Sequence, residues 1–322
     1  MTQQEVSFDS PRYLLYNQSI MEYQEKLTSV IGRYGNPFDE TTWEKSQTIG
    51  QIIEHFQDEK EVSLAGRVVS KREHVKSGFA HIMDHTGRIQ FYAQKNSLGD
   101  GFALFKDLDI GDIVGIKGKL FVTRTQEKTV LVSQIKLLAK ALRPLPEKWH
   151  GLKDVETRYR QRYLDLIANP QVRDVFIKRS RIVSRIRDFF EERGFIEVET
   201  PMLHRIAGGA AGRPFLTHHN ATGSDVYLRI APELYLKRLL VGSIEKNLEI
   251  NRSFRNEGIS TRHNPEFTML EAYCAYQGYE YMMGVCEELF VSLAGETCGS
   301  RTLEYQGKTI DFAPPWPRVS FA

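Results

Sequence analysis

The sequence has few cysteines, no long apolar run and almost no net charge. Its three cysteines, Cys274, Cys286 and Cys298, stand singly, without a Cys-x-x-Cys pair. A structural zinc site needs closely paired ligands, so we expect reduced thiols in or near a core. The N-terminal Met-Thr-Gln-Gln-Glu-Val is polar, and no apolar stretch reaches the length of a transmembrane helix. These absences predict a cytoplasmic protein that makes no membrane contact.

Net charge does not point to a preferred partner. The chain carries 43 lysines and arginines against 41 aspartates and glutamates, a net charge of +2. Any affinity for nucleic acid must therefore come from local basic patches, because the chain as a whole has no strong field. Hydrophobic residues make up 41% and charged residues 26%, which is typical of a globular protein. A length of 322 residues predicts about two domains.

Short alternating segments between residues 61 and 140 predict a small β-domain. Five runs have the alternation and flanking glycines of strands: 62–69, 78–84, 87–93, 112–118 and 129–132. A helical insertion is expected at residues 100–108, before the fourth strand. Five short strands with glycines at the bends favour a closed Greek-key barrel of the OB-fold type. Upstream, helical spacing over residues 19–34 predicts a surface helix that stops at Gly35.

Two prolines within residues 143–146 predict a stiff connector after the barrel. An amphipathic helix is expected beyond Pro170 and ends at residues 193–194; one stripe of this helix consists of Val175, Ile182, Ile186 and Phe189. The predicted organisation is a helical extension over 1–60, the barrel over 61–140, a linker over 141–157 and a second domain over 158–322. Such a chain belongs to the α+β class.

Residues 249–273 have the pattern of a strand, a polar loop bounded by Gly258 and Pro265, and a returning strand. This pattern predicts a long hairpin. Its mouth carries Arg-Asn-Glu at 255–257 and Arg-His-Asn-Pro-Glu-Phe at 262–267. Two arginines and a histidine can form a cradle for a polyphosphate, because guanidinium groups bind phosphate oxygens in pairs. The alternative is an ordinary charged hairpin, which a lone Arg-x-Glu would favour.

The hairpin resembles motif 2 of the class II aminoacyl-tRNA synthetases. Within that class, its sequence is most similar to that of the lysyl-tRNA synthetases. The resemblance implies an antiparallel-sheet catalytic domain and an ATP site made of Arg255, Glu257, His263, Asn264 and Phe267. Arg255 is then the catalytic residue, which binds the α-phosphate and the amino-acid carboxylate and acts through electrostatics. The same resemblance assigns the adenine amino group to Glu257, the distal phosphates to His263 and adenine stacking to Phe267. Asn264 would line the site.

Residues 194–201 (Gly-Phe-Ile-Glu-Val-Glu-Thr-Pro) combine a helix stop, an alternating strand and a proline that a central strand does not tolerate. The segment resembles motif 1 of the same family, which builds the dimer interface there, and it therefore predicts a homodimer. A generic helix–strand turn is the alternative. The position of the segment ahead of the hairpin, at about the family's interval, favours the dimer interpretation.

The expected amino-acid site consists of Gly209, Glu233, Arg255, Glu271 and Tyr273. In the glycine-rich residues 207–215 a backbone can approach a ligand closely, and the resemblance assigns the α-amino contact to Gly209. It also assigns pairing with the α-ammonium to Glu233, which could instead merely complement a helix dipole. Glu271 and Tyr273 should face the substrate side chain, where a carboxylate and a phenol suit an ammonium group. A neutral amino acid would leave that carboxylate unpaired and should be rejected.

The barrel offers Arg72, Phe79 and Gln90 on or beside the strands with which OB-folds bind single-stranded nucleic acid. Taken alone, Phe79 is more simply explained as a residue of the barrel core. The resemblance to the anticodon-binding barrel of lysyl and aspartyl enzymes favours a base-stacking role instead, and it assigns the three residues to the tRNA anticodon.

The resemblance as a whole implies a lysine--tRNA ligase, which activates lysine with ATP to lysyl-adenylate and transfers it to the 3′ end of tRNA(Lys). Motif 3 of the family, Gly-x-Gly-x-Asp-Arg, does not occur after Tyr273. In the family, the Mg²⁺ ligands belong to the same portion of the enzyme as motif 3, so no metal site is expected in this chain. We therefore expect an N-terminal portion of such an enzyme, inactive alone. The alternatives are a non-catalytic RNA-binding OB-fold protein, an inactive paralogue, and an aspartyl or asparaginyl ligase, against which Ala-Pro-Glu-Leu-Tyr at 231–235 argues.

Overall fold

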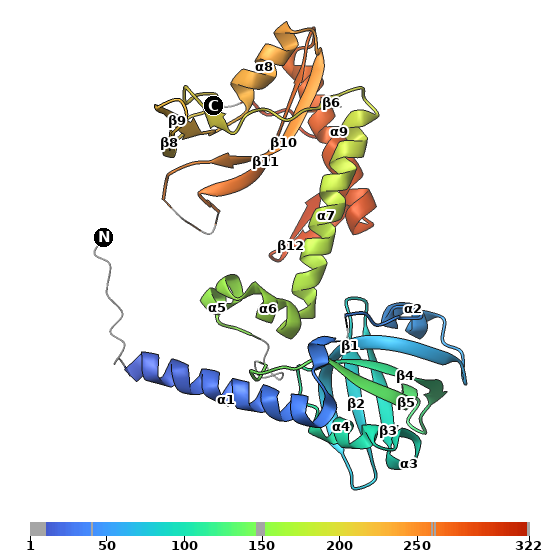
Figure 1. Ribbon diagram of the computed structural model, residues 1–322. Coiled ribbons are helices and arrows are strands. Elements are labelled where there is room, and N and C mark those ends of the chain that lie inside the picture. The colour runs from blue at the N-terminus through green and yellow to red at the C-terminus, as the bar shows by residue number, and fades with distance from the viewer. Residues whose placement is uncertain (1–10, 40, 146–151, 259, 261, 321–322) are drawn as a thin grey trace. The chain divides into compact units, whose positions relative to one another are not determined.

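The computed structural model describes residues 11–39, 41–145, 152–258, 260 and 262–320, with side chains from residue 21 onward (Figure 1). The chain divides into two compact units, Met1–Asn169 and Pro170–Ala322. Across the described ranges, none of the helices combines the length and apolar character that a membrane crossing requires. The predicted domain boundary at residue 158 stays a prediction, and residues 146–151 of the predicted linker lie outside the described residues.

The first unit is organised around a closed five-stranded barrel with the strand order β1-β2-β3-β5-β4. The strands are β1 (Glu61–Glu73), β2 (Ser77–Met83), β3 (Arg88–Gln94), β4 (Ile113–Val122) and β5 (Lys128–Ala139). β3 and β5 are parallel and the other neighbours are antiparallel. Alternate residues of β1 and β2 are buried, as a barrel with one inward face requires. The predicted OB-fold is confirmed.

Two short helices close the barrel core between the third and fourth strands. They are α3 (Lys95–Leu98) and α4 (Gly101–Asp107), and α4 confirms the predicted insertion. The ring of Phe105 is fully buried and meets Phe91 edge to face, with centroids 5.9 Å apart. Gly78 in β2 accommodates this ring, because a Cβ there would lie 2.5 Å from a Phe105 ring carbon. The helical insertion therefore completes the hydrophobic interior that the strands alone leave open.

The N-terminal extension contains α1 (Pro11–Tyr34), the 3₁₀ turn η1 (Pro37–Asp39) and α2 (Ile49–Glu54). α1 confirms the predicted helix and ends at Gly35, whose φ of 78° favours glycine. Polar contacts hold its C-terminal half on the barrel. The Tyr34 hydroxyl donates to Asp107 Oδ2 at 2.5 Å, and Lys26 pairs with Asp109 at 2.9 Å. Burial and the neighbouring Asp107 carboxylate raise the pKa of Tyr34 to about 12.

The end of the first unit folds into α5 (Val155–Arg160) and α6 (Arg162–Ala168). These helices meet at the buried Asp165, which accepts hydrogen bonds from Arg158 Nε at 2.9 Å and Asn169 Nδ2 at 2.6 Å. A buried carboxylate is costly unless it is paired, and these donors supply the pairing. The bonds organise the chain just before α7 begins.

The second unit is built on the predicted hairpin. β10 (Lys246–Phe254) and β11 (Glu266–Cys274) pair antiparallel, and the short β6 (Ile196–Glu197) pairs parallel to β10. α7 (Pro170–Glu191) and α9 (Tyr279–Cys298) pack with this sheet around one cluster of buried residues: Phe189, Phe190, Phe195, Leu248, Val285 and Leu289. The apolar stripe of α7 joins this core only at its C-terminal end, since Val175 is 63% exposed.

Smaller elements complete the second unit. A three-stranded sheet has the order β7-β9-β8, formed by β7 (Leu203–His204), β8 (Leu216–His219) and β9 (Ser224–Leu228). α8 (Glu233–Val241) follows and packs on β10 and β11. The hairpin of β12 (Thr302–Tyr305) and β13 (Lys308–Asp311) lies after α9. α8 is therefore tied to the β10–β11 hairpin, and the glycine-rich loop between β7 and β8 is joined to it through Asn256 N–H, which donates to Arg213 O.

Two of the three cysteines correct the prediction of thiols in or near a core. Cys286 and Cys298 are exposed, and Cys274 is half-buried. The reason is the orientation of α9, which buries Val285, Leu289 and Ala294 and thereby turns the following position, Cys286, outward. Among the described residues, no group of three His, Cys, Asp or Glu side chains could hold a metal ion.

Candidate functional site

A buried ion pair underlies the hairpin and connects three separate segments. Arg229 Nη1 lies 2.6 Å from Glu249 Oε1, and the two side chains are 1% and 4% exposed. Thr200, at the end of the motif 1 segment, donates to the other Glu249 oxygen at 2.6 Å. Arg229 Nε also donates to the backbone oxygen of Arg252 in β10, at 2.8 Å. These bonds tie Thr200 and Arg229 to β10, the strand that ends just before Arg255.

Sequence reasoning did not identify this pair. The available signal was the presence of a charged residue in each of two short apolar runs, Tyr-Leu-Arg-Ile-Ala at 227–231 and Leu-Glu-Ile at 248–250. Charges so placed are buried only when they are paired. The partner of each could not be named, because the two runs lie in different elements and only the fold brings them together.

Arg255 lies where the hairpin meets the glycine-rich loop. Its backbone N–H donates to Pro265 O at 2.9 Å, which closes the mouth of the hairpin. Its guanidinium carbon lies 5.3 Å from the centroid of the Phe267 ring. A Cβ at Gly212 would be 3.2 Å from Arg255 Cδ, so the loop approaches this side chain closely. The buried Nε of Arg255 has no hydrogen-bond acceptor in the part of the chain that the structure describes.

The glycine-rich loop is also bonded to the loop of the hairpin. Asn256 N–H donates to Arg213 O at 2.7 Å, and Arg213 N–H donates to Glu257 Oε1 at 3.2 Å. Three of the predicted ATP-binding residues, Arg255, Glu257 and Phe267, are therefore held around one junction. The arrangement presents one guanidinium, one carboxylate and one aromatic face together.

The two remaining ATP-site predictions, His263 and Asn264, lie farther along the hairpin loop and are exposed. His263 Nδ1 is 2.8 Å from the hydroxyl of Ser260. Within the described residues, neither His263 nor Asn264 is hydrogen-bonded or ion-paired to the junction around Arg255. Their expected roles stay predictions.

The predicted amino-acid residues gather where α8 and β11 meet the glycine-rich loop. Gly209 has a φ of +91°, and a Cβ there would lie 3.1 Å from the Cβ of Glu233, so backbone and space both favour glycine. Tyr273 donates its hydroxyl to Glu271 Oε2 at 3.1 Å. Glu233, at the first turn of α8, accepts from Lys237 Nζ at 2.6 Å. The assembled site carries two carboxylates and a phenol, together with the Lys237 ammonium that pairs with Glu233.

Burial raises the pKa of Glu271 above its ordinary value. The hydrogen bond from Tyr273 and the charge of Lys237 act in the opposite direction, whereas the nearby carboxylates of Glu233 and Glu249 raise this pKa further. Burial and Glu271 likewise raise the pKa of Tyr273. A carboxylate that is partly desolvated and faces other carboxylates gains most from a cation, because the cation removes both penalties. The site is therefore suited to an ammonium group.

The barrel carries a groove of about 910 Å³ that brings together all three predicted RNA-binding residues, Arg72, Phe79 and Gln90. Phe79 is half-buried and stacks on Tyr92 with ring centroids 4.5 Å apart and planes 23° from parallel. Phe79 thus lies on the wall of the groove and not among the buried residues of the barrel core. An aromatic pair beside an arginine is a suitable surface for stacking a nucleobase.

Two further polar residues of the same groove, His81 and Glu127, were not predicted from the sequence. Gln90 Nε2 donates to Glu127 Oε2 at 2.8 Å, and Thr129 donates to Gln90 Oε1 at 2.9 Å. His81 Nε2 lies 2.7 Å from Glu127 Oε1. The sequence does not indicate the bonds of Glu127 to Gln90 and His81, because Glu127 lies just before β5 and reaches these residues only when the barrel closes.

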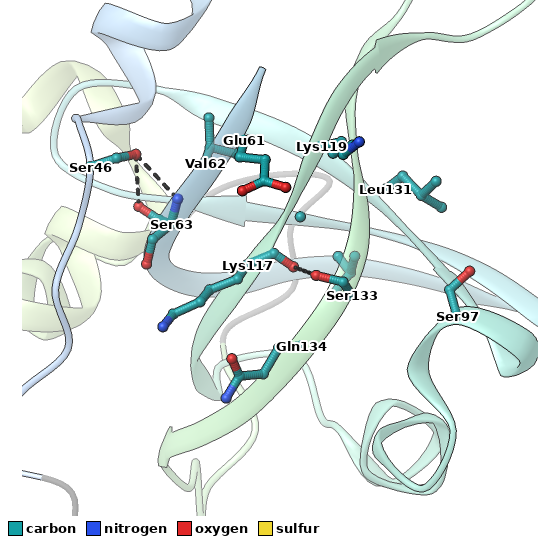
Figure 2. A pocket seen from close by; sticks show the side chains of 12 residues that line it. Ser46, Glu61, Val62, Ser63, Ser97, Lys117, Lys119, Leu131, Ser133 and Gln134 are labelled. Carbon is teal, nitrogen blue, oxygen red and sulfur yellow. Dashed lines mark hydrogen bonds between the residues drawn. The ribbon is translucent and has the colours of Figure 1, made fainter. Parts of the chain in front are cut away.

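A second hollow of about 570 Å³ lies over β1, β4 and β5 (Figure 2). Hydroxyl groups and lysines line much of it: Ser46, Ser63, Lys117, Lys119 and Ser133. Two of these, Ser46 and Ser63, are hydrogen-bonded to each other, as Figure 2 shows. Its lining contains no aromatic side chain and none of the predicted site residues, so it lacks a stacking surface for a base.

Two segments of the sequence match models of known families. Residues 154–322 match the family described as tRNA synthetases class II (D, K and N). Residues 62–138 match the family described as OB-fold nucleic acid binding domain. The two matched segments contain the hairpin site and the barrel groove, respectively.

Curated relatives are similar over most of the chain. A lysine--tRNA ligase of Carboxydothermus hydrogenoformans is 55% identical over 310 residues, which cover 94% of this chain and 62% of the relative. A lysine--tRNA ligase of Pelotomaculum thermopropionicum is 54% identical over 94% of this chain and 60% of the relative. One of Moorella thermoacetica is 56% identical over 90% of this chain and 59% of its own length. The chain thus spans about three fifths of the length of these relatives.

Proposed function

The chain belongs to the class II (D, K and N) tRNA synthetases, and from this membership we propose that it provides the ATP-, lysine- and tRNA-binding parts of a lysine--tRNA ligase. The observation that carries the proposal is the acidic site at β11, where Glu271 and Tyr273 form a hydrogen-bonded pair near Glu233. Two carboxylates match the two ammonium groups of lysine. The similarity to curated lysine--tRNA ligases supports the same substrate.

The proposed reaction begins with bound lysine and ATP. An oxygen of the lysine carboxylate attacks the α-phosphorus of ATP, the bond to the β-phosphate oxygen breaks, and pyrophosphate leaves with that electron pair. The products are lysyl-adenylate and pyrophosphate. The adenylate then esterifies the terminal ribose of tRNA(Lys) and releases AMP. The chain's own contribution to the first step is to bind and orient both substrates.

Arg255 is proposed to hold the lysine carboxylate against the α-phosphate. Its buried, unbonded Nε and its position between Phe267 and the glycine-rich loop support this role. A fixed guanidinium stabilises the charge that grows on the phosphoryl oxygens in the transition state. Phe267 is proposed to stack on adenine, Glu257 to accept the adenine amino group, and His263 and Asn264 to line the phosphate end.

Glu271 is proposed to bind the side-chain ammonium of lysine, with Tyr273 holding the carboxylate in place. Glu233 and the backbone at Gly209 are proposed to bind the α-ammonium. Aspartate would bring a third carboxylate to this site, and like charges in a half-buried site repel each other strongly. This disfavours the aspartyl alternative, and a neutral asparagine side chain would leave Glu271 without a cation.

Magnesium is proposed to enter with ATP. No group of three acidic or imidazole side chains lies together among the described residues, and Mg²⁺ that is bound with ATP needs only one or two carboxylates besides the phosphates. We also propose a location in the cytoplasm.

A homodimer is proposed through the motif 1 region. Apolar side chains there are exposed on α7, β6 and β7, with Val175 at 63%, Ile196 at 55% and Leu203 at 48%. Exposed apolar side chains on these three elements are available for a second subunit to cover.

A second candidate function is an RNA-binding protein without ligase activity. The groove around Phe79, Gln90 and Arg72 favours it, because that groove lies in the barrel and needs nothing from the hairpin site. Lysine binding separates the two candidates, since only the ligase requires it.

The experiment is a calorimetric titration of the purified 322-residue chain with lysine, norleucine and aspartate. Norleucine has the same four-carbon side chain as lysine but lacks its terminal ammonium. We expect lysine to bind at least about tenfold more tightly than norleucine, since a charge-assisted bond contributes roughly 1.5–3 kcal/mol. Equal affinity for lysine and norleucine would contradict the assignment of Glu271, and preferential binding of aspartate would overturn the choice of amino acid.

A further inference from the structure

A line of four polar side chains crosses the barrel groove from its edge to its floor. Ser70 Oγ in β1 lies 2.8 Å from Nδ1 of His81 in β2. His81 Nε2 lies 2.7 Å from Glu127 Oε1, and Glu127 Oε2 accepts from Gln90 Nε2 in β3 at 2.8 Å. All four side chains line the groove that also holds Phe79.

The chemistry of the groups fixes the direction of each bond. A carboxylate only accepts, so Nε2 of His81 must carry the proton that faces Glu127, and the amide nitrogen of Gln90 must also face it. The Thr129 hydroxyl lies 2.9 Å from Gln90 Oε1 and 3.0 Å from the backbone oxygen of Glu127, and its one proton supports the same amide orientation when it points to Oε1. When Nδ1 of the neutral imidazole accepts from Ser70, every group in the line has one defined role.

This network leaves one donor, on Gln90, and two acceptor oxygens, on Glu127, available to a ligand. Gln90 retains its second amide N–H, and the Glu127 carboxylate retains lone pairs on both oxygens. The side chain of Glu127 is 43% exposed, whereas that of His81 is only 18% exposed. A long, exposed glutamate has several rotamers, and one bond from a less mobile ring selects among them.

We propose that His81 is a positioning residue for the reading of a base by the barrel. It fixes Glu127, and Glu127 in turn fixes the amide of Gln90 beside the Phe79–Tyr92 stack. The ligand is an unpaired base in an RNA loop, held by stacking and read along its hydrogen-bonding edge. This inference rests on the proposed binding of the tRNA anticodon, and it assigns sequence discrimination to a residue that need not touch the RNA.

The role of His81 differs from that of Phe79 in a measurable way. Stacking accepts every base, so Phe79 contributes affinity without regard to sequence. A fixed donor beside a fixed acceptor discriminates between bases, because a wrong edge leaves these groups unpaired. Loss of His81 should therefore reduce the ratio of matched to mismatched binding and leave mismatched binding nearly unchanged.

The test uses the 322-residue chain and two RNA hairpins in a fluorescence anisotropy titration at fixed salt. One hairpin carries the lysine anticodon with uracil at its centre. The other has cytosine there, which exchanges the O4 carbonyl for an amino group and the N3–H donor for an acceptor. His81→Leu should lower the uracil-to-cytosine affinity ratio about tenfold, since a lost charge-assisted bond has that order of effect. Affinity for the cytosine hairpin should change less than about twofold.

Two conservative variants separate positioning from folding. The amide nitrogen of His81→Gln can take the place of the imidazole Nε2 and should restore most of the ratio. His81→Asn is shorter, reaches only toward Ser70 and should not restore it. Thermal melting of each variant verifies that the barrel is folded.

Each outcome decides the inference. A ratio that falls in His81→Leu and His81→Asn and returns in His81→Gln supports the positioning role. A wild-type ratio in His81→Leu overturns the inference and leaves the proposed RNA binding intact. Equal losses for both hairpins mean that His81 supports the barrel only, and they also overturn it. If the unmodified chain binds neither hairpin, the proposed RNA binding itself is wrong and the inference falls with it.

Discussion

The hydroxyl of Tyr273 donates to Glu271 Oε2 at 3.1 Å, and both residues point to the same face of β11 because they are two positions apart. This pair gives the proposed amino-acid site its charge and its orientation. Burial of Glu271 raises the pKa of its carboxyl group, and repulsion from the nearby Glu233 carboxylate raises this pKa further. A ligand with an ammonium group relieves this repulsion.

Replacement of Glu271 by glutamine should separate binding from stability. Glu271→Gln keeps the shape and the bond to Tyr273 but removes the charge, so lysine affinity should fall by roughly 1.5–3 kcal/mol. Because a raised folded-state pKa means that the ionised form disfavours folding, the variant should melt at or above the wild-type temperature near neutral pH. Calorimetry and thermal melting measure the two effects. Tyr273→Phe, which keeps the charge, is the matched control and should lose less affinity.

Lysine binding should depend on pH through the same carboxylate. Glu271 has a raised pKa in the folded chain, so its contribution to stability is fully present below its ordinary pKa and is lost as pH rises through the raised value. Lysine binding runs in the opposite direction, because it requires the ionised form. Affinity should therefore decline on acidification at a pH above the usual range for glutamate. A titration series from pH 4 to pH 8 measures this, and a flat profile in that window would contradict the role of Glu271.

The buried pair of Arg229 and Glu249 should be far more important to the fold than its surface counterparts. Arg229→Met leaves Glu249 buried without its cation and should cost about 3–5 kcal/mol of unfolding free energy. The double variant Arg229→Met with Glu249→Leu removes both charges and should recover a large part of that loss. Denaturant unfolding of both variants gives the comparison. Arg187→Met, at an exposed pair with Glu197, is the control and should cost about 0–1 kcal/mol.

Phe79 should contribute stacking energy to RNA binding and nothing to lysine binding. Phe79→Ala should weaken binding of an anticodon hairpin by about 1–3 kcal/mol. Lysine affinity, measured on the same preparation by calorimetry, should be unchanged because the amino-acid site lies in the other unit. A variant that melts early and loses RNA affinity only in proportion to its unfolding would show that the ring serves the fold instead.

Local patterns predicted most of the fold. Alternation and glycine positions identified five strands of the barrel, and the helix stops at Gly35 and Gly194 have the positive φ that such stops use. The burial of β10 could not be predicted in this way. Its buried positions include Glu249, Asn251 and Ser253, whereas Ile250 and Phe254 are only half-buried, so the polar face is turned inward. The polar side chains can be buried because Arg229 pairs with Glu249 and Ser253 donates to Asn251. A periodic pattern of apolar residues does not reveal these partners.

The candidate site was predictable where its residues are contiguous in motifs. The resemblance of local motifs to those of the family identified five residues that the fold brings to adjoining elements: Gly209, Glu233, Arg255, Phe267 and Glu271. Glu127, His81 and Arg229 were missed because each acquires its partner only through long-range pairing. A single sequence contains no information on which of many charged residues will meet.

Arg255 should be required for adenylate formation and dispensable for RNA binding. The activity assay uses this chain extended by the part of the Carboxydothermus lysine--tRNA ligase that lies outside the matched residues. In that extended chain, Arg255→Ala should reduce lysine-dependent ATP–pyrophosphate exchange by on the order of 10³-fold, because a positioned arginine makes a contribution of this size in phosphoryl transfer. Binding of an anticodon hairpin should stay within about twofold of wild type. Near-normal exchange by the variant would remove the motif 2 arginine from the mechanism.

The most direct test of the central claim is the same exchange assay with an amino-acid panel. The extended chain is incubated with ATP and labelled pyrophosphate in the presence of lysine, norleucine, aspartate or asparagine, and the label incorporated into ATP is measured. The acidic site around Glu271 and Glu233 predicts exchange that depends on lysine and is at least about tenfold weaker with each of the others. Exchange supported by aspartate or asparagine but not by lysine would contradict the account.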